Sequence, residues 1–194
     1  MDDKLTLPTI TGLAINPAAW LAKRYLETSD WNLCKKEAID INLMQIDKTA
    51  TAIRYLSYTI KLLKILDKKE LELLATQKAD VQRAILWLAF CRTYPLVGKF
   101  ADTVINQKFN QHDFHLSFGE WNEFLSRESN EHQEIEDIGK FSRVKAKSVL
   151  FGNLRGIGYL SSSYELQDAM LTKEVISVIG DDIRFFPCIT RGAK

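Results

Sequence analysis

Apolar residues recur at helical spacing along most of this chain. The clearest stripe contains Ile53, Leu56, Ile60 and Leu63, which follow one another at intervals of three and four residues. Such spacing places apolar side chains on one side of an α-helix. Similar patterns and their flanking polar residues predict helices over residues 17–28, 31–39, 47–66, 68–75, 81–94, 95–109, 118–129, 140–157 and 172–179.

The segment "ILWLAFCRTYPLV" (residues 85–97) has the strongest apolar character. Its apolar run is far shorter than the ~18 residues that a membrane helix needs, and Arg83 and Arg92 bracket it. A helix that is apolar nearly all round belongs in the centre of a fold. Cys91 lies within it without a neighbouring histidine, which favours a packed thiol over a catalytic one.

Capping residues refine the predicted helix starts. Asn16 before Pro17, Asp67, Asp80 and the pair Ser117 with Glu120 are expected N-terminal caps, while Gly158 is an expected C-terminal cap. Residues 158–172 are expected to form either a small hairpin, which would make a winged-helix-like lobe, or an irregular loop. We therefore expect an all-α, compact multi-helix globule with lobes at residues 1–133 and 134–194, packed as one globular unit.

Charge is strongly segregated along the chain although the formal net charge is only +1. Residues 48–100 contain ten Lys/Arg and four Asp/Glu, residues 101–139 contain two and nine, and residues 140–155 contain five and none. A nucleic-acid surface on such a chain must come from local clusters of cations. The competing interpretation is an ordinary solvated helix face, or pairing of the cations with the acidic segment 120–137.

Two helices carry the candidate cations. Arg54, Lys61 and Lys64 fall within about 80° of one another on the helix over residues 47–66, away from its apolar stripe. On the helix over residues 140–157, three cations share a face: Lys140, Arg143 and Lys147. Lys145 points to another side of this helix, and Arg155 lies near its other end. Long cationic side chains of this kind suit phosphate groups.

Other chemical motifs are scarce. The chain has no GxxxxGK[ST] or GxSxG motif, and the glycines of "GNLRGIG" lie at the end of a helix instead of after a strand. His112 and His115 are three residues apart, and His132 lies among acidic residues, but polar loop positions are the favoured interpretation. We predict no catalytic residue, no metal, no cofactor, no small-molecule substrate and no membrane association. Three separated cysteines and an acidic N-terminus favour a reducing cytoplasm.

Three segments resemble the BrxA family of bacteriophage exclusion (BREX) systems. Residues 18–63 resemble its opening, with an arginine in a long third helix. Residues 74–109 resemble its central segment, where a glutamine-containing helix leads to Cys-Arg-x-Tyr and then to a helix with a phenylalanine. Residues 140–162 resemble its late helix, which ends in Leu-Arg, a glycine and a hydrophobic turn.

The resemblance implies a small helical cytoplasmic protein without catalytic activity, working beside the other subunits of an antiviral defence system that gives phage resistance. It also implies binding of double-stranded DNA through an electropositive groove. The eight cations named above are consistent with that groove. The alternative is a protein–protein adaptor within the defence complex without direct nucleic-acid binding, and RNA binding is a third option.

Overall fold

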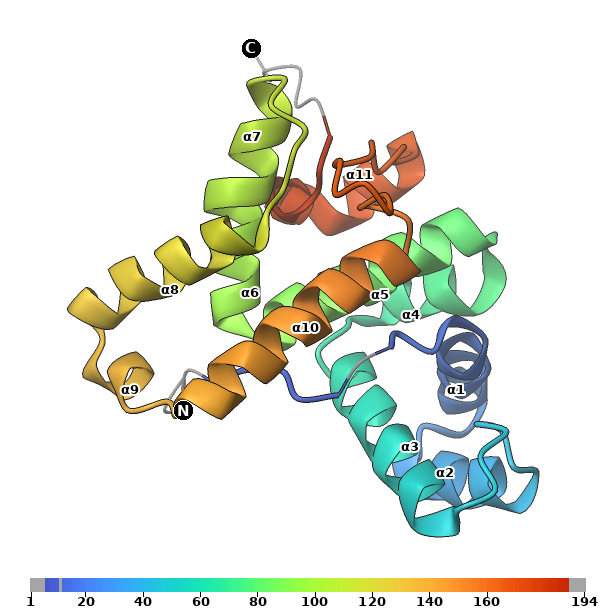
Figure 1. Ribbon diagram of the computed structural model, residues 1–194. Helices are drawn as coiled ribbons and strands as arrows, with labels where there is room; N and C mark the ends of the chain where they lie inside the picture. Colours follow the sequence, from blue (N-terminus) through green and yellow to red (C-terminus); the bar gives the residue numbers. More distant parts are fainter. Residues whose placement is uncertain (1–5, 11, 189–194) are drawn as a thin grey trace. The chain divides into compact units, whose positions relative to one another are not determined.

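The computed structural model describes residues 6–10 and 12–188, and helices make up its regular secondary structure (Figure 1). The prediction of an all-α fold is confirmed. By contacts the chain divides into two compact units. Among the described residues, the α5 unit comprises residues 13–93 and 171–180, and the α10 unit comprises residues 6–10, 12, 94–170 and 181–188. These boundaries differ from the expected lobes at residues 1–133 and 134–194, which stay a prediction.

The α5 unit is a bundle built round one helix. It contains α1 (Ile15–Thr28), α2 (Trp31–Asp40), α3 (Thr49–Leu63), α4 (Lys68–Thr76), α5 (Ala79–Thr93) and α11 (Lys173–Ile179). Helix α5 packs against α1, α3 and α4, while α2 packs against α1 and α3. Helix α11 is separated from the rest in sequence and contacts α4.

Helix α5 is buried on all its sides, as its sequence predicts. Every residue from Ala84 to Cys91 is buried, and the rings of Trp87 and Phe90 lie 5.8 Å apart between centroids. A helix without a polar face must be enclosed by other helices, which explains why α5 is central. Cys91 is buried, as are Cys34 and Cys188. Burial raises the pKa of the Cys188 thiol to about 11.

An ion pair between Glu70 and Arg92 joins α4 to α5. Glu70 is only 1% exposed, and Arg92 Nη1 donates to its Oε2 at 2.9 Å. Arg92 Nη2 lies 2.9 Å from Oε1. The same carboxylate accepts the Asp67 backbone N–H at 2.8 Å, which completes a capping box at the start of α4. One side chain therefore caps a helix and pairs with a cation.

Several predicted helix caps are confirmed and two are wrong. Asp67 and Ser117 each begin a capping box, and Gly158 has the positive φ of a helix-terminating glycine. Asn16 is not the cap of α1, because Ala14 is at that position and Asn16 lies inside the first turn. Asp80 also lies inside its helix, where it pairs with Arg83 at 2.8 Å. An acidic residue is favourable anywhere in a first turn, so its presence does not fix the start.

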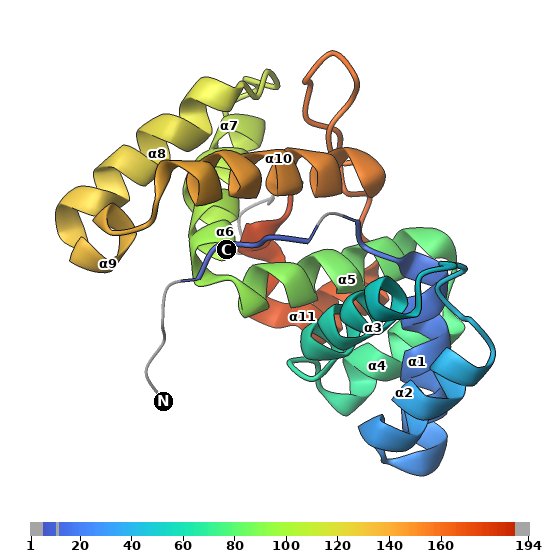
Figure 2. The same cartoon turned by 60° about the horizontal axis from the view of Figure 1, so that its bottom comes forward.

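The α10 unit contains a helix that is interrupted by a π-helical stretch. The prediction of one helix over residues 95–109 becomes α6 (Pro95–Phe100), π-helical η1 (Ala101–Asn106) and α7 (Gln107–Asn110) in direct succession. Figure 2 shows α6 and α7 as consecutive parts of one rod. The unit continues with α8 (Phe118–Glu131), α9 (Gln133–Glu136) and α10 (Lys140–Gly156), and the 3₁₀ helix η2 spans Gly180–Phe185. Short α9 and η2 were not predicted.

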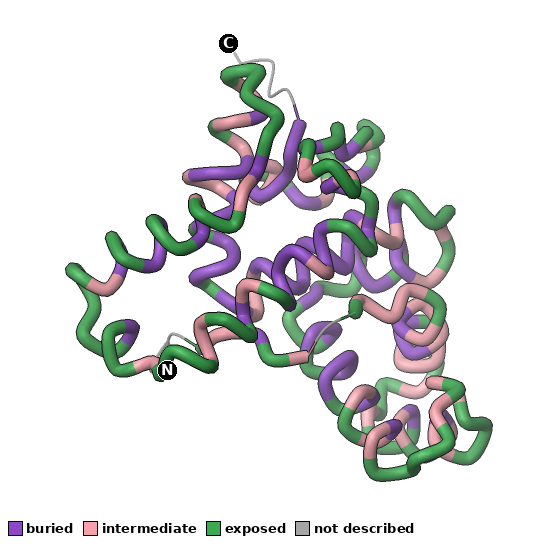
Figure 3. Tube along the Cα trace, in the orientation of Figure 1, coloured by how far each residue is buried: buried purple, intermediate pink, exposed green. Residues whose placement is uncertain are grey.

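Aromatic rings fill the interior of the α10 unit. Phe100 meets Trp121 and Phe124 of α8 edge-on, at centroid distances of 4.9 and 5.2 Å. Phe118 packs against Phe151 of α10 at 4.5 Å. The second half of α10 is mostly buried while its first half is largely exposed, as Figure 3 shows. This agrees with the apolar composition of residues 149–154 and the cationic composition before them.

The chain reverses direction after α10 without forming a strand among the described residues. Leu160 pairs with Leu166 in an isolated antiparallel bridge, and His115 pairs with Glu165 in another. The backbone N–H of Ser161 donates to the carbonyl of Glu165 at 2.9 Å. The segment is thus a bridged turn that lies between the two expectations, a hairpin and an irregular loop. Within residues 6–10 and 12–188, no helix has the length and apolar character needed to cross a bilayer.

Replacing Leu86 by Ala should destabilise the protein by about 2–5 kcal/mol, because the shorter side chain would leave a cavity between α5 and the helices that enclose it. The matched control is Leu33→Ala on α2, where the same atoms are removed from a partly exposed side chain. Urea unfolding monitored by circular dichroism measures both. Equal unfolding midpoints for the two variants would contradict the central placement of α5.

Replacing Arg92 by Ala should cost about 3–5 kcal/mol, because the buried Glu70 carboxylate loses its cation. Adding Glu70→Gln should recover part of that loss, since a buried amide is less costly than a buried charge. Arg83→Ala provides the control: it breaks the exposed pair with Asp80 and should cost less than about 1 kcal/mol. Thermal unfolding of the parent protein and the three variants gives the comparison.

Candidate nucleic-acid interface

The predicted cations of α3 point away from its buried stripe. Leu56, Ile60 and Leu63 are buried, whereas Arg54, Lys61 and Lys64 are exposed. The guanidinium carbon of Arg54 lies 5.7 Å from the ring centroid of Tyr55, a distance at which the cation and the ring attract one another. Packing of the apolar stripe thus leaves all three cations on the outside of the α5 unit.

Two of these cations line a surface hollow of about 280 Å³ between α2 and α3. Lys61 and Lys64 come from the end of α3, and Lys35 comes from the facing side of α2. The remaining lining residues are Trp31, Asn32, Ser57 and Ile60. Three ammonium-bearing chains and two neutral polar side chains therefore surround one hollow whose lining contains no carboxylate. The hydroxyl of Ser57 donates to the carbonyl of Ile53 at 2.7 Å, so the donors available to a ligand are the three ammonium groups and the amide of Asn32. Such a set of donors suits a phosphate group.

Lys35 was not identified from the sequence. It lies in residues 1–47, where acidic residues outnumber basic ones, so no local charge cluster marks it. The available signal was the four-residue spacing between Trp31 and Lys35, which places both side chains on the same side of a helix. Trp31 is fixed by stacking on Tyr25, with centroids 4.0 Å apart and planes 8° from parallel.

Asp30, which directly precedes Trp31, is the carboxylate nearest in sequence to the α2 residues of the hollow. It forms hydrogen bonds with the backbone. Its Oδ1 accepts the N–H of Asn32 at 2.8 Å and of Leu33 at 3.2 Å, as the N-terminal cap of α2. These hydrogen bonds direct the charge of Asp30 toward the helix end. The hollow is therefore a cationic surface beside a capped helix, and helix α2 has no open N-terminus to offer a ligand.

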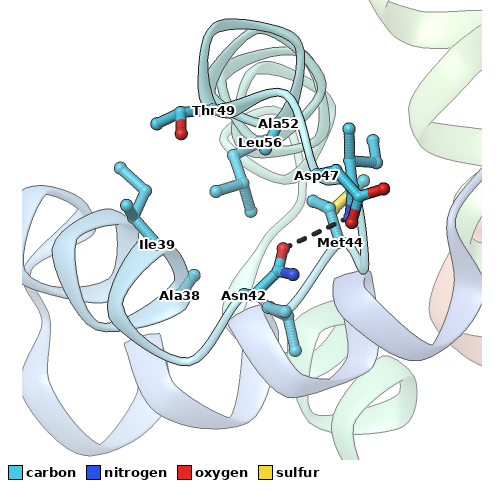
Figure 4. Close-up of a pocket in the computed structure, with 10 residues that line it drawn as sticks. Ala38, Ile39, Asn42, Met44, Asp47, Thr49, Ala52 and Leu56 are labelled. Atoms are coloured by element: carbon cyan, nitrogen blue, oxygen red, sulfur yellow. Dashed lines mark hydrogen bonds between the residues drawn. The ribbon is translucent and has the colours of Figure 1, made fainter.

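A second hollow in the same unit has a different character (Figure 4). It measures about 190 Å³ and lies between the end of α2, the following loop and the start of α3. Asn42 Oδ1 accepts the backbone N–H of Ile46 at 3.2 Å and so holds the loop. Asp47 is the only charged residue in its lining, so this hollow does not suit an anion.

The first half of α10 carries the second predicted set of cations. Lys140 and Lys145 are exposed, and no carboxylate among the described residues forms an ion pair with either. Lys147 is half-buried, with its Nζ 5.3 Å from the ring centroid of Phe118 and 3.4 Å from Asn122 Oδ1. Arg155 is exposed at the far end, 5.5 Å from the ring centroid of Tyr164. Lys140 and Lys145 are thus the best placed to receive phosphate.

Arg143 has a structural role that the sequence did not indicate. Its Nε donates to the carbonyl of Ile138 at 2.9 Å, and its Nη2 donates to the carbonyls of Ile135 at 2.6 Å and Glu136 at 3.1 Å. These acceptors belong to α9 and the turn that follows it. The guanidinium therefore holds α9 against the start of α10, and its assignment to a DNA interface stays a prediction.

The acidic segment takes its ion pairs from other helices. Lys99 of α6 lies 2.7 Å from Glu128 Oε2 and 3.8 Å from Glu131 Oε2. Lys108 lies 2.5 Å from both Asp113 Oδ2 and Glu120 Oε1, and its ammonium holds the pKa of Asp113 below its usual range. Within the described part of the chain, the predicted cations of α10 do not form ion pairs with these carboxylates.

One acidic group has ligand atoms close enough to hold a metal ion. Atoms of Glu128, Glu131 and His132 lie within 4.8 Å of one another. The ammonium of Lys99 already lies within ion-pair distance of both carboxylates, which makes this an ion-pair network. His112 adopts a positive φ in the turn after α7, and His115 follows in the bridged loop. Neither belongs to a group of three metal-ligating side chains among the described residues.

The two predicted sets of cations belong to different units. Arg54, Lys61 and Lys64 are gathered on the α5 unit, where Lys35 joins them. The five cations of residues 140–155 are on the α10 unit. Each set is a cluster within its own unit, and their convergence into one groove stays a prediction.

The fold and these surfaces define a class: an all-α protein with exposed cationic helix faces. Comparison of the sequence with known families gives the family. The sequence model of BrxA matches residues 9–182, which is most of the chain, and the chain therefore belongs to the BrxA family. This confirms the resemblance drawn from the sequence and associates the chain with BREX systems.

A solved structure shares the fold. It is the crystal structure of an uncharacterized protein from Magnetospirillum magneticum, which is 17% identical in sequence. The alignment covers 92% of this chain and 94% of that one with a TM-score of 0.74. At this identity the likeness concerns the fold alone. No curated protein matches the chain.

Replacing Arg143 by Ala should release α9, because three backbone carbonyls lose their shared donor. Hydrogen exchange should become faster at residues 133–139 and stay unchanged in α5. Lys145→Ala is the control, since it removes an exposed cation from the same helix. Similar exchange in both variants would contradict the structural role of Arg143.

Proposed function

We propose that the chain is a non-catalytic accessory subunit of a bacterial BREX phage-defence system and that it binds double-stranded DNA in the cytoplasm. Family membership supports the association with BREX. The observation that carries the DNA-binding part is the convergence of Lys35, Lys61 and Lys64 on one hollow without a carboxylate in its lining. An electropositive groove, implied by the family resemblance, is part of the proposal.

The chemistry of the proposed contact is directed at the DNA backbone. Lysine ammonium groups and the side-chain amide of Asn32 match phosphate oxygens, whereas the lining offers few groups that distinguish one base from another. Lys140 and Lys145 on α10 supply further exposed cations. We therefore expect weak sequence preference and strong salt dependence, because each phosphate contact releases counterions.

The chain's low net charge is compatible with this function. Carboxylates of residues 101–139 are partly neutralised by Lys99 and Lys108, both within the α10 unit. Arg54, Lys61 and Lys64 on the α5 unit and Lys140 and Lys145 on the α10 unit are exposed. Local potential, and not the sum of charges, decides whether a surface attracts a polyanion.

The triple variant Lys35→Ala, Lys61→Ala and Lys64→Ala should bind duplex DNA more weakly and lower the salt slope of log K by about 2–3, at roughly one phosphate per lysine. Fluorescence anisotropy at several salt concentrations measures both effects. The matched control replaces Lys23, Lys36 and Lys69, which are exposed on the same unit outside the hollow. An equal effect of the control would show that only net charge matters and would remove the hollow from the proposal.

The competing function is a protein–protein adaptor within the defence complex. Its distinguishing experiment is co-purification of the tagged chain with BREX subunits before and after nuclease treatment. If duplex DNA does not bind the parent protein while subunits stay bound after nuclease, the adaptor function replaces the DNA-binding one.

A further inference from the structure

Phe141, in the first turn of α10, is unusually exposed for an aromatic side chain. It is 84% exposed, more than any other large hydrophobic residue among those described. Val144, one turn further along, is also exposed. Single exposed apolar residues are common, but a phenyl ring standing almost free of its own protein contributes nothing to the core. Its position therefore calls for a function outside the fold.

The neighbours of Phe141 on the helix surface are cations. At roughly 100° per residue, Val144, Ser148 and Phe141 lie between Lys140 on one side and Lys145 on the other, within an arc of about 140°. All five residues are exposed. The arrangement is an apolar ridge flanked on both sides by ammonium groups, which we call the Phe141 ridge.

The acidic segment that precedes α10 is held on the side of this helix opposite Phe141. Arg143 follows Phe141 by two residues and so lies nearly opposite it on the helix. Its hydrogen bonds to the carbonyls of Ile135, Glu136 and Ile138 hold α9 on that side. The Phe141 ridge thus faces solvent with cations as its lateral neighbours, and residues 140–155 contain no Asp or Glu.

The start of α10 adds to this positive character. Gly139 is its N-cap and provides no side-chain cap, so the first N–H groups of a 17-residue helix keep their donors available. The helix dipole places partial positive charge at the same end. Phe141 therefore projects from a helix start where lysine side chains, backbone N–H groups and the helix dipole all favour phosphate.

We propose that Phe141 inserts as a wedge between neighbouring base pairs of duplex DNA, with Lys140 and Lys145 on the flanking phosphates and Val144 against the sugars. The inference rests on the proposed DNA-binding function and extends it to deformation of the duplex. Apolar wedges of this kind unstack a base step, and the cost is offset by burial of the ring and by closer backbone contacts. Charge complementarity favours a polyanion over an apolar pocket as the occupant, and the proposed DNA-binding function identifies that polyanion as DNA.

The test compares Phe141→Ala with Met170→Ala, which removes another strongly exposed apolar side chain from the same unit. Affinity for duplex DNA is measured by anisotropy across a salt series. Unstacking is measured on a duplex that contains 2-aminopurine, whose fluorescence rises when the base loses its stacking partner. Because both side chains are exposed, circular dichroism should show unchanged folding.

Phe141→Ala should bind about tenfold more weakly with an unchanged salt slope, since no charge is lost, and the 2-aminopurine signal of the parent should disappear. Met170→Ala should behave as the parent, and Phe141→Trp should restore binding. If the parent binds DNA without unstacking it, or if Phe141→Ala binds like the parent, the wedge is wrong while DNA binding stands. If the parent fails to bind DNA, the proposed function fails first. Loss of a BREX subunit from Phe141→Ala, with DNA binding unchanged, assigns the ring to a protein contact and also overturns the wedge.

Discussion

The enclosure of α5 is the constraint from which the arrangement of the α5 unit follows. Since this helix has no face that tolerates water, α1, α3 and α4 must each present an apolar side to it. For α3 this requirement fixes the rotation of the helix about its axis. Once Leu56, Ile60 and Leu63 are inside, Arg54, Lys61 and Lys64 have to lie outside. The cationic surface is thus a consequence of packing, and it needs no specific interaction to hold it in place.

Charges that approach the interior are handled in a different way from those on the surface. Glu70 is buried, so it carries a cation from α5 and a backbone N–H of its own helix. Arg143 is half-buried and directs its donors to carbonyls of α9. Both side chains are committed to the fold, because leaving a desolvated charge without partners is costly. Cations such as Lys140 and Lys145 remain hydrated in the free protein, which leaves them able to exchange water and counterions for phosphate at little structural cost.

The sequence was sufficient for the helical class, for the central helix and for most helix limits, because these depend on periodicity and on capping residues that act locally. It was insufficient where contacts between distant residues decide. Lys35 joins Lys61 and Lys64 only because α2 packs beside α3, and no spacing along the chain encodes that neighbourhood. In the sequence Arg143 resembles the solvated cations around it, yet the short helix α9 and the turn after it provide backbone carbonyls that accept its hydrogen bonds. The π-helical stretch from Ala101 to Asn106 adds a wider turn to an otherwise ordinary apolar pattern, and periodicity alone does not distinguish the two.

The two cationic surfaces differ in a way that bears on how the chain would hold DNA. The hollow beside α3 combines three lysines with Asn32 in a concave surface, which suits a phosphate that is bound from several directions. The Phe141 ridge is convex and places an apolar ring between cations, which suits entry between bases. A concave backbone site confers affinity and register but no distortion, while a wedge creates distortion and needs neighbouring backbone contacts to offset its cost. The two surfaces are therefore complementary in their chemistry, and a chain with a net charge of only +1 can concentrate its binding energy in these few contacts instead of distributing it over a uniformly basic surface.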